Sequence, residues 1–347
     1  MPFGPFILQW RTPSPNPPAP TPLPPGITRT YIPTSAGPLE LLSSLPSSTS
    51  DPTQPERPPL FFAHGGFGCA FFWVPYMQFF SARGYPCYAV SYRGHGGSWY
   101  PGLLRMYFAP RSKLVEDLVD GVKYAEGLEK ERRGGKEDVK AVLIAHSNGG
   151  QLAQYALSRG LVTVGGYCHF AAVPAFGSFS CYKFWAPTAI FHMYYRCFHP
   201  RYILASIKQV KDAFFLPSTP DSQVQEFSRL LSPYESMLWA PQGLFAFVTG
   251  PDVLRSIAGW RVGGPDRMLV LAAERDVLCT PALLRDAAAR YRAGLEKMIK
   301  SKEVEGEADR EWEGVRFRFV NGLPHHLQNS EEWERGAEEV LEWVEQL

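Results

Sequence analysis

Ser147 is the residue whose neighbourhood in this 347-residue chain most clearly points to chemistry. It lies in the hexapeptide A-H-S-N-G-G (145–150), between an apolar run typical of a strand (139–145) and a segment with helical spacing that ends at Gly160. A serine on such a turn exposes its hydroxyl above a sheet, and small neighbours permit the strained backbone. The first N–H groups of the helix would stabilise negative charge beside that hydroxyl. The alternative is a serine that only caps the helix.

The hexapeptide resembles the nucleophile elbow of the α/β-hydrolase superfamily, usually written G-x-S-x-G, with Ala145 in place of the first glycine. The resemblance covers roughly residues 28–345, and its motifs occur in the family's order. It implies a serine hydrolase with a triad in the order serine, acid, histidine. Epoxide hydrolases and haloalkane dehalogenases of this fold carry Asp at the elbow, so Ser147 excludes their chemistry.

The resemblance also implies a base, because a serine hydroxyl is a poor nucleophile until its proton is taken. The family's histidine follows the last strand, and here the apolar run 315–320 is followed by N-G-L-P-H-H-L. We expect His325 to be the base, since the family's imidazole comes directly after the turn-forming residues. His326 is the alternative, and we expect it to pack nearby.

The family's acid fixes the tautomer of that imidazole and follows the penultimate strand. Asp276 holds the usual position after the run 268–273, and Glu274 is the competitor. Some family members carry the acid one strand earlier, but no Asp or Glu occurs between Ser147 and Asp212. We therefore expect Asp276 to be the acid.

Two glycine-rich turns complete the resemblance. The tetrapeptide H-G-G-F (64–67) resembles the family's oxyanion loop, so the backbone N–H of Gly66 or Phe67, with that of Asn148, would hold the oxyanion. The second turn, R-G-H-G (93–96), is interpreted as structural, with His95 packed inside it.

Strand and helix patterns alternate around these motifs, which predicts an α/β-hydrolase fold with a mostly parallel sheet between helices. Two short strands, 29–32 and 39–42, flank an early turn. The further apolar runs are 60–63, 88–92, 139–145, 164–172, 268–273 and 315–320.

The alternation stops at residues 174–264, which are rich in aromatic residues and predict a helical cap inserted into a core of residues 28–173 and 265–347. Some cap aromatics should face Ser147, which favours a lipophilic substrate, although core packing explains them as well. The basic residues of the cap would let it rest on an anionic membrane surface. Residues 1–27 form a proline-rich arm, which we interpret as solvated and dispensable for folding.

Composition narrows the function further. Thirty-five Lys and Arg against 34 Asp and Glu give a formal charge of +1, which offers no electrostatic case for nucleic acid. The six cysteines are scattered without metal-type pairs, so we expect small buried side chains, no metal and no cofactor. Neither a signal-like N-terminus nor a long apolar run is seen, and a cytoplasmic location is expected.

The sequence therefore predicts a hydrolase of an ester, lactone or thioester of a small lipophilic molecule. An acyltransferase or a carbon–carbon bond hydrolase would use the same triad. A non-catalytic receptor on this fold is the third hypothesis, and a complete triad argues against it. Nothing in the sequence indicates the oligomeric state.

Overall fold

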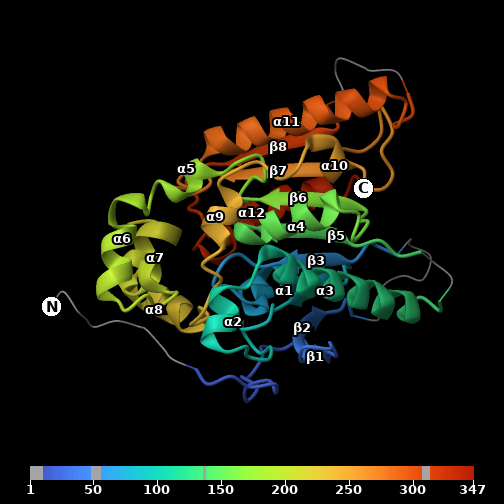
Figure 1. Ribbon diagram of the computed structural model, residues 1–347. Coiled ribbons are helices and arrows are strands. Elements are labelled where there is room, and N and C mark those ends of the chain that lie inside the picture. The colour runs from blue at the N-terminus through green and yellow to red at the C-terminus, as the bar shows by residue number, and fades with distance from the viewer. Residues whose placement is uncertain (1–10, 48–55, 136–137, 307–312) are drawn as a thin grey trace.

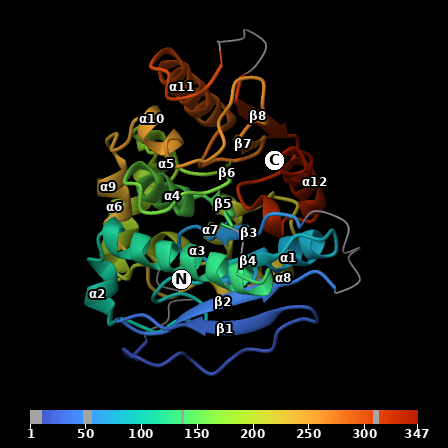
Figure 2. The same ribbon diagram turned by 90° about the vertical axis from the view of Figure 1, so that its right-hand side faces the viewer.

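The computed structural model describes residues 11–47, 56–135, 138–306 and 313–347. Its centre is an eight-stranded sheet in the order β1-β2-β4-β3-β5-β6-β7-β8 (Figures 1 and 2). The strands are β1 (Thr28–Ile32), β2 (Leu39–Ser44), β3 (Leu60–Ala63), β4 (Cys87–Val90), β5 (Val142–His146), β6 (Gly166–Phe170), β7 (Met268–Ala273) and β8 (Val315–Val320). Strands β3 to β8 are parallel, and β2 is antiparallel to β1 and β4. The predicted, mostly parallel sheet is confirmed.

Burial explains why the central strands are mostly apolar. Every residue of β3, β5, β6 and β7 is buried, as expected for parallel strands covered by helices on both faces. The edge strand β8 is instead fully buried only at its two end residues, and Arg316 and Arg318 reach Glu342 on the following helix.

Helices cover both faces of the sheet (Figure 2). One apolar core lies under α1 (Val74–Ser81) and α12 (Trp333–Val344), with the short helices η1 (Ala70–Trp73) and η3 (Leu327–Asn329) beside them. The other lies under α3 (Arg111–Arg132), α4 (Asn148–Ser158) and α11 (Pro281–Lys300), near the short helix α2 (Leu103–Tyr107). Within the described ranges, no helix is long and apolar enough to cross a membrane.

A helical insertion separates β6 from β7. It contains α5 (Phe179–Tyr182), α6 (Ala186–Tyr195), η2 (Tyr202–Leu204), α7 (Ile207–Phe214), α8 (Asp221–Leu230), α9 (Trp239–Gly243) and α10 (Gly250–Leu254). Helices α6 to α8 lie beyond the C-terminal ends of the parallel strands (Figure 1). Helix α10 packs closely against α11, in the body of the molecule. A Cβ on Gly250 would lie only 3.0 Å from the Arg290 carbonyl oxygen of α11.

Residues 1–10 of the expected arm lie outside the described residues. Most of residues 11–27 are exposed, but some groups of this segment contact the body. Ser14 pairs with Tyr100 in an isolated bridge, and Leu23 packs on the core under α1. The backbone of Arg11 holds the hydroxyl of the buried Tyr234, which accepts the N–H at 2.6 Å and donates to the carbonyl at 3.1 Å. The prediction of buried cysteines is confirmed except at Cys197, which is exposed.

Candidate active site

Ser147, His325 and Asp276 meet at the C-terminal edge of the sheet. They come from the turns that follow β5, β8 and β7. The Ser147 Oγ–H donates to His325 Nε2 at 2.9 Å, and the His325 Nδ1–H donates to Asp276 Oδ2 at 2.8 Å. The side chains of the histidine and the aspartate are buried. This geometry lets the imidazole accept the serine proton while the carboxylate stabilises the charge that results.

The Asp276 carboxylate is fixed from its other side as well. Its Oδ1 accepts the N–H groups of Leu278 and Cys279, each at 2.8 Å. Glu274, the competing acid in the sequence, is 38% exposed at its side chain and accepts the Gly322 N–H at 2.7 Å. The structure therefore brings Asp276 to the imidazole and uses Glu274 in the turn after β8.

His326 lies in a separate environment from His325. Its ring packs edge-on against Phe227, with ring centroids 4.6 Å apart, and against Phe214 at 5.4 Å. Burial, together with the neighbouring His325, holds the pKa of His326 well below its usual value. The elbow residue His146 donates its Nε2–H to the His325 carbonyl at 3.0 Å. The sequence could not predict this contact, because the family motif leaves that position open.

The elbow is strained at Ser147, where φ is 51° and ψ is −126°. Such a conformation costs about 1–3 kcal/mol, which the surrounding packing must offset. Neighbouring chain segments pass very close to it. A Cβ on Gly149 would lie 2.3 Å from the His64 carbonyl oxygen, and one on Gly150 would lie 2.3 Å from the Ala172 Cβ. These contacts explain why glycine follows the elbow at both positions.

The oxyanion loop contains one engaged and one open N–H group. The Phe67 N–H donates to Glu235 Oε2 at 2.8 Å, so it is occupied within the protein. The N–H groups of Gly66 and Asn148 donate to no acceptor in the described part of the chain, and both residues line the cavity at Ser147. Of the two alternatives in the loop, the structure therefore favours Gly66.

Glu235 is a buried acid that the sequence interpretation missed. It belongs to the insertion, and its Oε2 also lies 3.1 Å from His95 Nε2. His95 Nδ1 lies 2.9 Å from the Arg93 carbonyl, so both ring nitrogens face acceptors and the ring carries two protons. Burial lowers the pKa of His95, but the charge and hydrogen bond of Glu235, with the Arg93 carbonyl, outweigh it and the pKa is raised. Burial likewise raises the pKa of Glu235, but the charge and hydrogen bond of His95, with the Phe67 N–H, leave it lowered.

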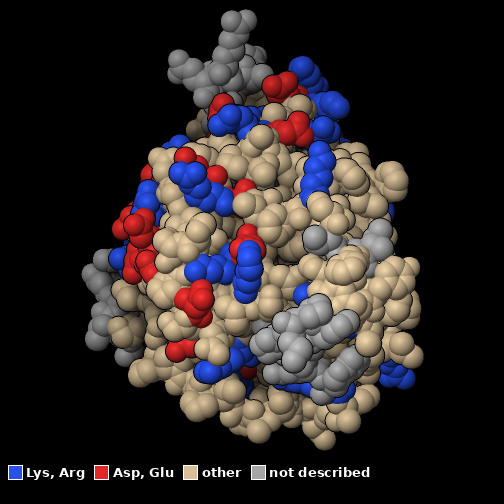
Figure 3. Space-filling model, turned by 90° about the vertical axis from the view of Figure 1, so that its left-hand side faces the viewer, with Lys and Arg blue, Asp and Glu red and all other residues tan. Residues whose placement is uncertain are grey.

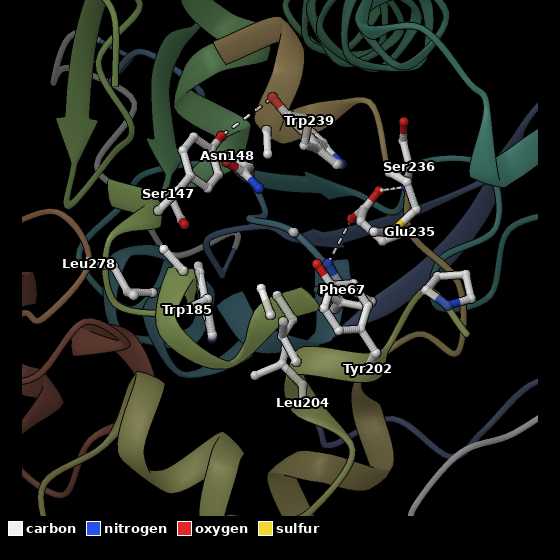
Figure 4. Close-up of a pocket in the computed structure, with 18 of the residues that line it drawn as sticks. Phe67, Ser147, Asn148, Trp185, Tyr202, Leu204, Glu235, Ser236, Trp239 and Leu278 are labelled. Atoms are coloured by element: carbon white, nitrogen blue, oxygen red, sulfur yellow. Dashed lines mark hydrogen bonds between the residues drawn. The ribbon is translucent and has the colours of Figure 1, made fainter. Parts of the chain in front are cut away.

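The cavity beside Ser147 has a volume of about 220 Å³ and a mainly apolar lining. Figure 4 shows Ser147 and Glu235 on opposite sides of it. Tyr182, Trp185 and Tyr202 of the insertion line it, whereas Phe179, Phe191, Tyr194 and Phe198 are exposed. Its remaining lining residues are Gly66, Phe67, Asn148, Ala186, Ala189, Pro200, Ile203, Leu204, Phe214, Ser236, Met237, Trp239, Ala240 and Leu278.

Among the described residues, one group of potential metal ligands comes together, namely Asp276, Cys279 and His325, with ligand atoms within 4.8 Å of one another. Two of them are already hydrogen-bonded to each other. Burial raises the pKa of the Cys279 thiol well above its usual value, which disfavours the thiolate that a metal requires. The group is therefore better explained as part of the hydrogen-bonded site.

Comparisons with known proteins agree on the fold. A model described as the alpha/beta hydrolase family matches residues 60–312. An esterase, EaEST, from Exiguobacterium antarcticum has a TM-score of 0.61 and 16% identity over 92% of this chain and 100% of its own. Est816, described as an N-acyl homoserine lactone degrading enzyme, has a TM-score of 0.58 and 18% identity over 90% of this chain and 100% of its own. The carboxylesterase CesB from Bacillus subtilis has a TM-score of 0.55 and 18% identity over 92% of this chain and 91% of its own. No curated protein matches the chain in sequence.

Proposed function

Because the chain belongs to the α/β-hydrolase family, we propose that it is a serine hydrolase that cleaves an ester, lactone or thioester through an acyl-enzyme on Ser147. The observation that carries the proposal is the hydrogen-bonded series from Ser147 to His325 to Asp276, with distances of 2.9 and 2.8 Å. A serine becomes a nucleophile when a base within hydrogen-bond reach takes its proton.

In the first half-reaction, Ser147 Oγ attacks the carbonyl carbon of the substrate while its proton passes to His325 Nε2. The oxyanion that forms accepts the N–H groups of Gly66 and Asn148. As the bond to the leaving group breaks, the imidazolium protonates that alcohol or thiol and an acyl-enzyme remains. In the second half-reaction, His325 takes a proton from water as the water oxygen attacks the acyl carbon. It returns that proton to Ser147 Oγ when the bond to the serine breaks and the acid product leaves.

The lining of the cavity favours a lipophilic acyl group larger than acetate. Trp185, Leu204 and Leu278 offer apolar surface near Ser147, and such surface contributes roughly 25 cal/mol per Å² of apolar ligand area that it removes from water. The fold-related proteins EaEST and Est816 are an esterase and a lactone-degrading enzyme, which supports the choice of bond.

The exposed surface of the insertion supports contact with an anionic membrane. Phe191 and Tyr194 of α6 are 70% and 63% exposed, and the exposed Lys183 lies close in sequence. Acidic side chains are sparse on the right-hand part of the face turned to the reader in Figure 3. Exposed aromatic residues beside basic ones are typical of surfaces that rest on anionic lipid.

The test is labelling with a fluorophosphonate probe, followed by turnover of esters, lactones and thioesters of graded size. The wild-type protein should be labelled at Ser147. Ser147→Ala should lose labelling and at least about 10⁴-fold in kcat, as expected when a triad member is removed. A folded Ser147→Ala variant that turns over substrate at the wild-type rate would overturn the proposal.

A further inference from the structure

A segment of the insertion, residues 232–236, holds the oxyanion loop at Phe67. Phe67 has a φ of 59°, in the left-handed region of backbone conformation that residues other than glycine rarely adopt. Its carbonyl accepts the Ser232 N–H at 2.8 Å, and its own N–H donates to Glu235 Oε2 at 2.8 Å. One short segment therefore binds both the N–H and the carbonyl of this strained residue.

Glu235 lies directly beside the expected oxyanion donor. A Cβ built on Gly66 would lie 3.6 Å from Glu235 Oε2, which is van der Waals contact. Glu235 is only 3% exposed, and its Oε1 accepts the Ser236 N–H at 2.7 Å. Water therefore screens its charge poorly, and an unbalanced carboxylate here would oppose the oxyanion that the reaction generates.

His95 supplies the balancing charge. It lies 3.1 Å from Glu235 and is held at its other ring nitrogen by the Arg93 carbonyl. The other titratable groups that face it are the rings of His64 and Tyr92, with centroids 5.1 and 6.3 Å away, and Asp117, which Arg93 binds. His64 is neutral in this arrangement, because its Nε2 accepts the Tyr92 N–H at 3.2 Å.

We propose that Glu235 is a positioning residue of the reaction, which fixes the oxyanion loop through Phe67 and depends on protonated His95 to balance its charge. The inference rests on the proposed function, since it concerns the same tetrahedral intermediate. It also gives the insertion a role in the chemistry besides covering the site. As pH rises and His95 loses its proton, the unbalanced carboxylate should slow turnover.

The test compares Glu235→Ala, Glu235→Gln and the matched control Glu226→Ala, an exposed glutamate on α8 of the same insertion. Glu235→Ala should lower kcat about 10- to 100-fold with little change in KM, because the loop loses its anchor while the cavity remains. Glu235→Gln keeps an acceptor for the Phe67 N–H and has no charge to balance. It should stay closer to wild type and lose the decline at alkaline pH. Glu226→Ala should match wild type.

A second comparison keeps the inference testable if Glu235→Ala does not fold, as judged by circular dichroism. His95→Asn should lower kcat by leaving the carboxylate unbalanced, and the double variant with Glu235→Gln should recover part of the loss. Equal kcat for Glu235→Ala and wild type, or an unchanged alkaline decline in Glu235→Gln, would overturn the inference. Its failure is distinguishable from failure of the proposed function, in which the wild-type protein itself shows neither labelling nor turnover that depends on Ser147.

Discussion

His325 and His326 are adjacent in sequence, yet their side chains have different surroundings. The first contacts a carboxylate and the serine hydroxyl, whereas the second lies in an apolar cluster with Phe72, Phe214 and Phe227. The backbone separates the two roles, because His326 donates its N–H to the Phe214 carbonyl at 3.1 Å. One loop thus fastens the insertion to the body and presents an imidazole to Ser147.

This difference predicts opposite consequences for two alanine variants. His325→Ala should lower kcat by about 10⁴-fold with little loss of stability, because it removes the proton acceptor. His326→Ala should lose about 2 kcal/mol of unfolding free energy through the cavity it leaves, and should keep most of its activity. Urea unfolding and ester hydrolysis measure the two effects. If His326→Ala were the inactive variant, the base would be one residue further along the chain.

At the scale of secondary structure, the sequence predicted what depends on local pattern. Apolar runs marked the parallel strands, and the expected acid and histidine could be chosen because each follows a strand. Glu235 could not be found in this way, since its bond to Phe67 joins residues 168 positions apart. The signal that could have drawn attention to it is that Glu235 is the only acid between Glu226 and Asp252, in a stretch rich in apolar residues.

Helix α6 should set the acyl length that the cavity accepts. Ala189 lines the cavity and is half-buried, so Ala189→Trp would fill space near Trp185 without disturbing the sheet. We expect the wild-type protein to prefer p-nitrophenyl esters longer than acetate. Ala189→Trp should lower kcat/KM for the long esters by about 10-fold or more and leave acetate nearly unchanged.

The control is Gln225→Trp, which adds the same indole at an exposed position of α8. It should follow the wild-type chain-length profile. A wild-type optimum at acetate, with rates that fall steadily as the chain lengthens, would argue against a lipophilic acyl pocket. Repeating the series with anionic vesicles tests membrane contact separately, since contact should raise the rate for long esters.

Across the whole molecule, three segments distant in sequence form one connected support for the site. The N-terminal arm holds Tyr234 through the Arg11 backbone, the adjacent Glu235 holds Phe67, and Phe67 belongs to the loop beside Ser147. The arm makes its bonds to Tyr234 with backbone groups, and such contacts leave no signature in residue type. The proline-rich composition therefore could not predict them.

Removing residues 1–24 should therefore weaken both the fold and the reaction. The truncated protein loses the hydrogen bonds at Tyr234, each worth about 1 kcal/mol, and frees the segment that carries Glu235. We expect a lower Tm and a several-fold fall in kcat. Tyr234→Phe should shift both in the same direction by less. Tyr31→Phe is the matched control, since the Tyr31 hydroxyl bonds no residue in the described ranges. Calorimetry measures the Tm and ester turnover measures kcat. A truncated protein with the Tm and the kcat of the wild type would contradict the prediction.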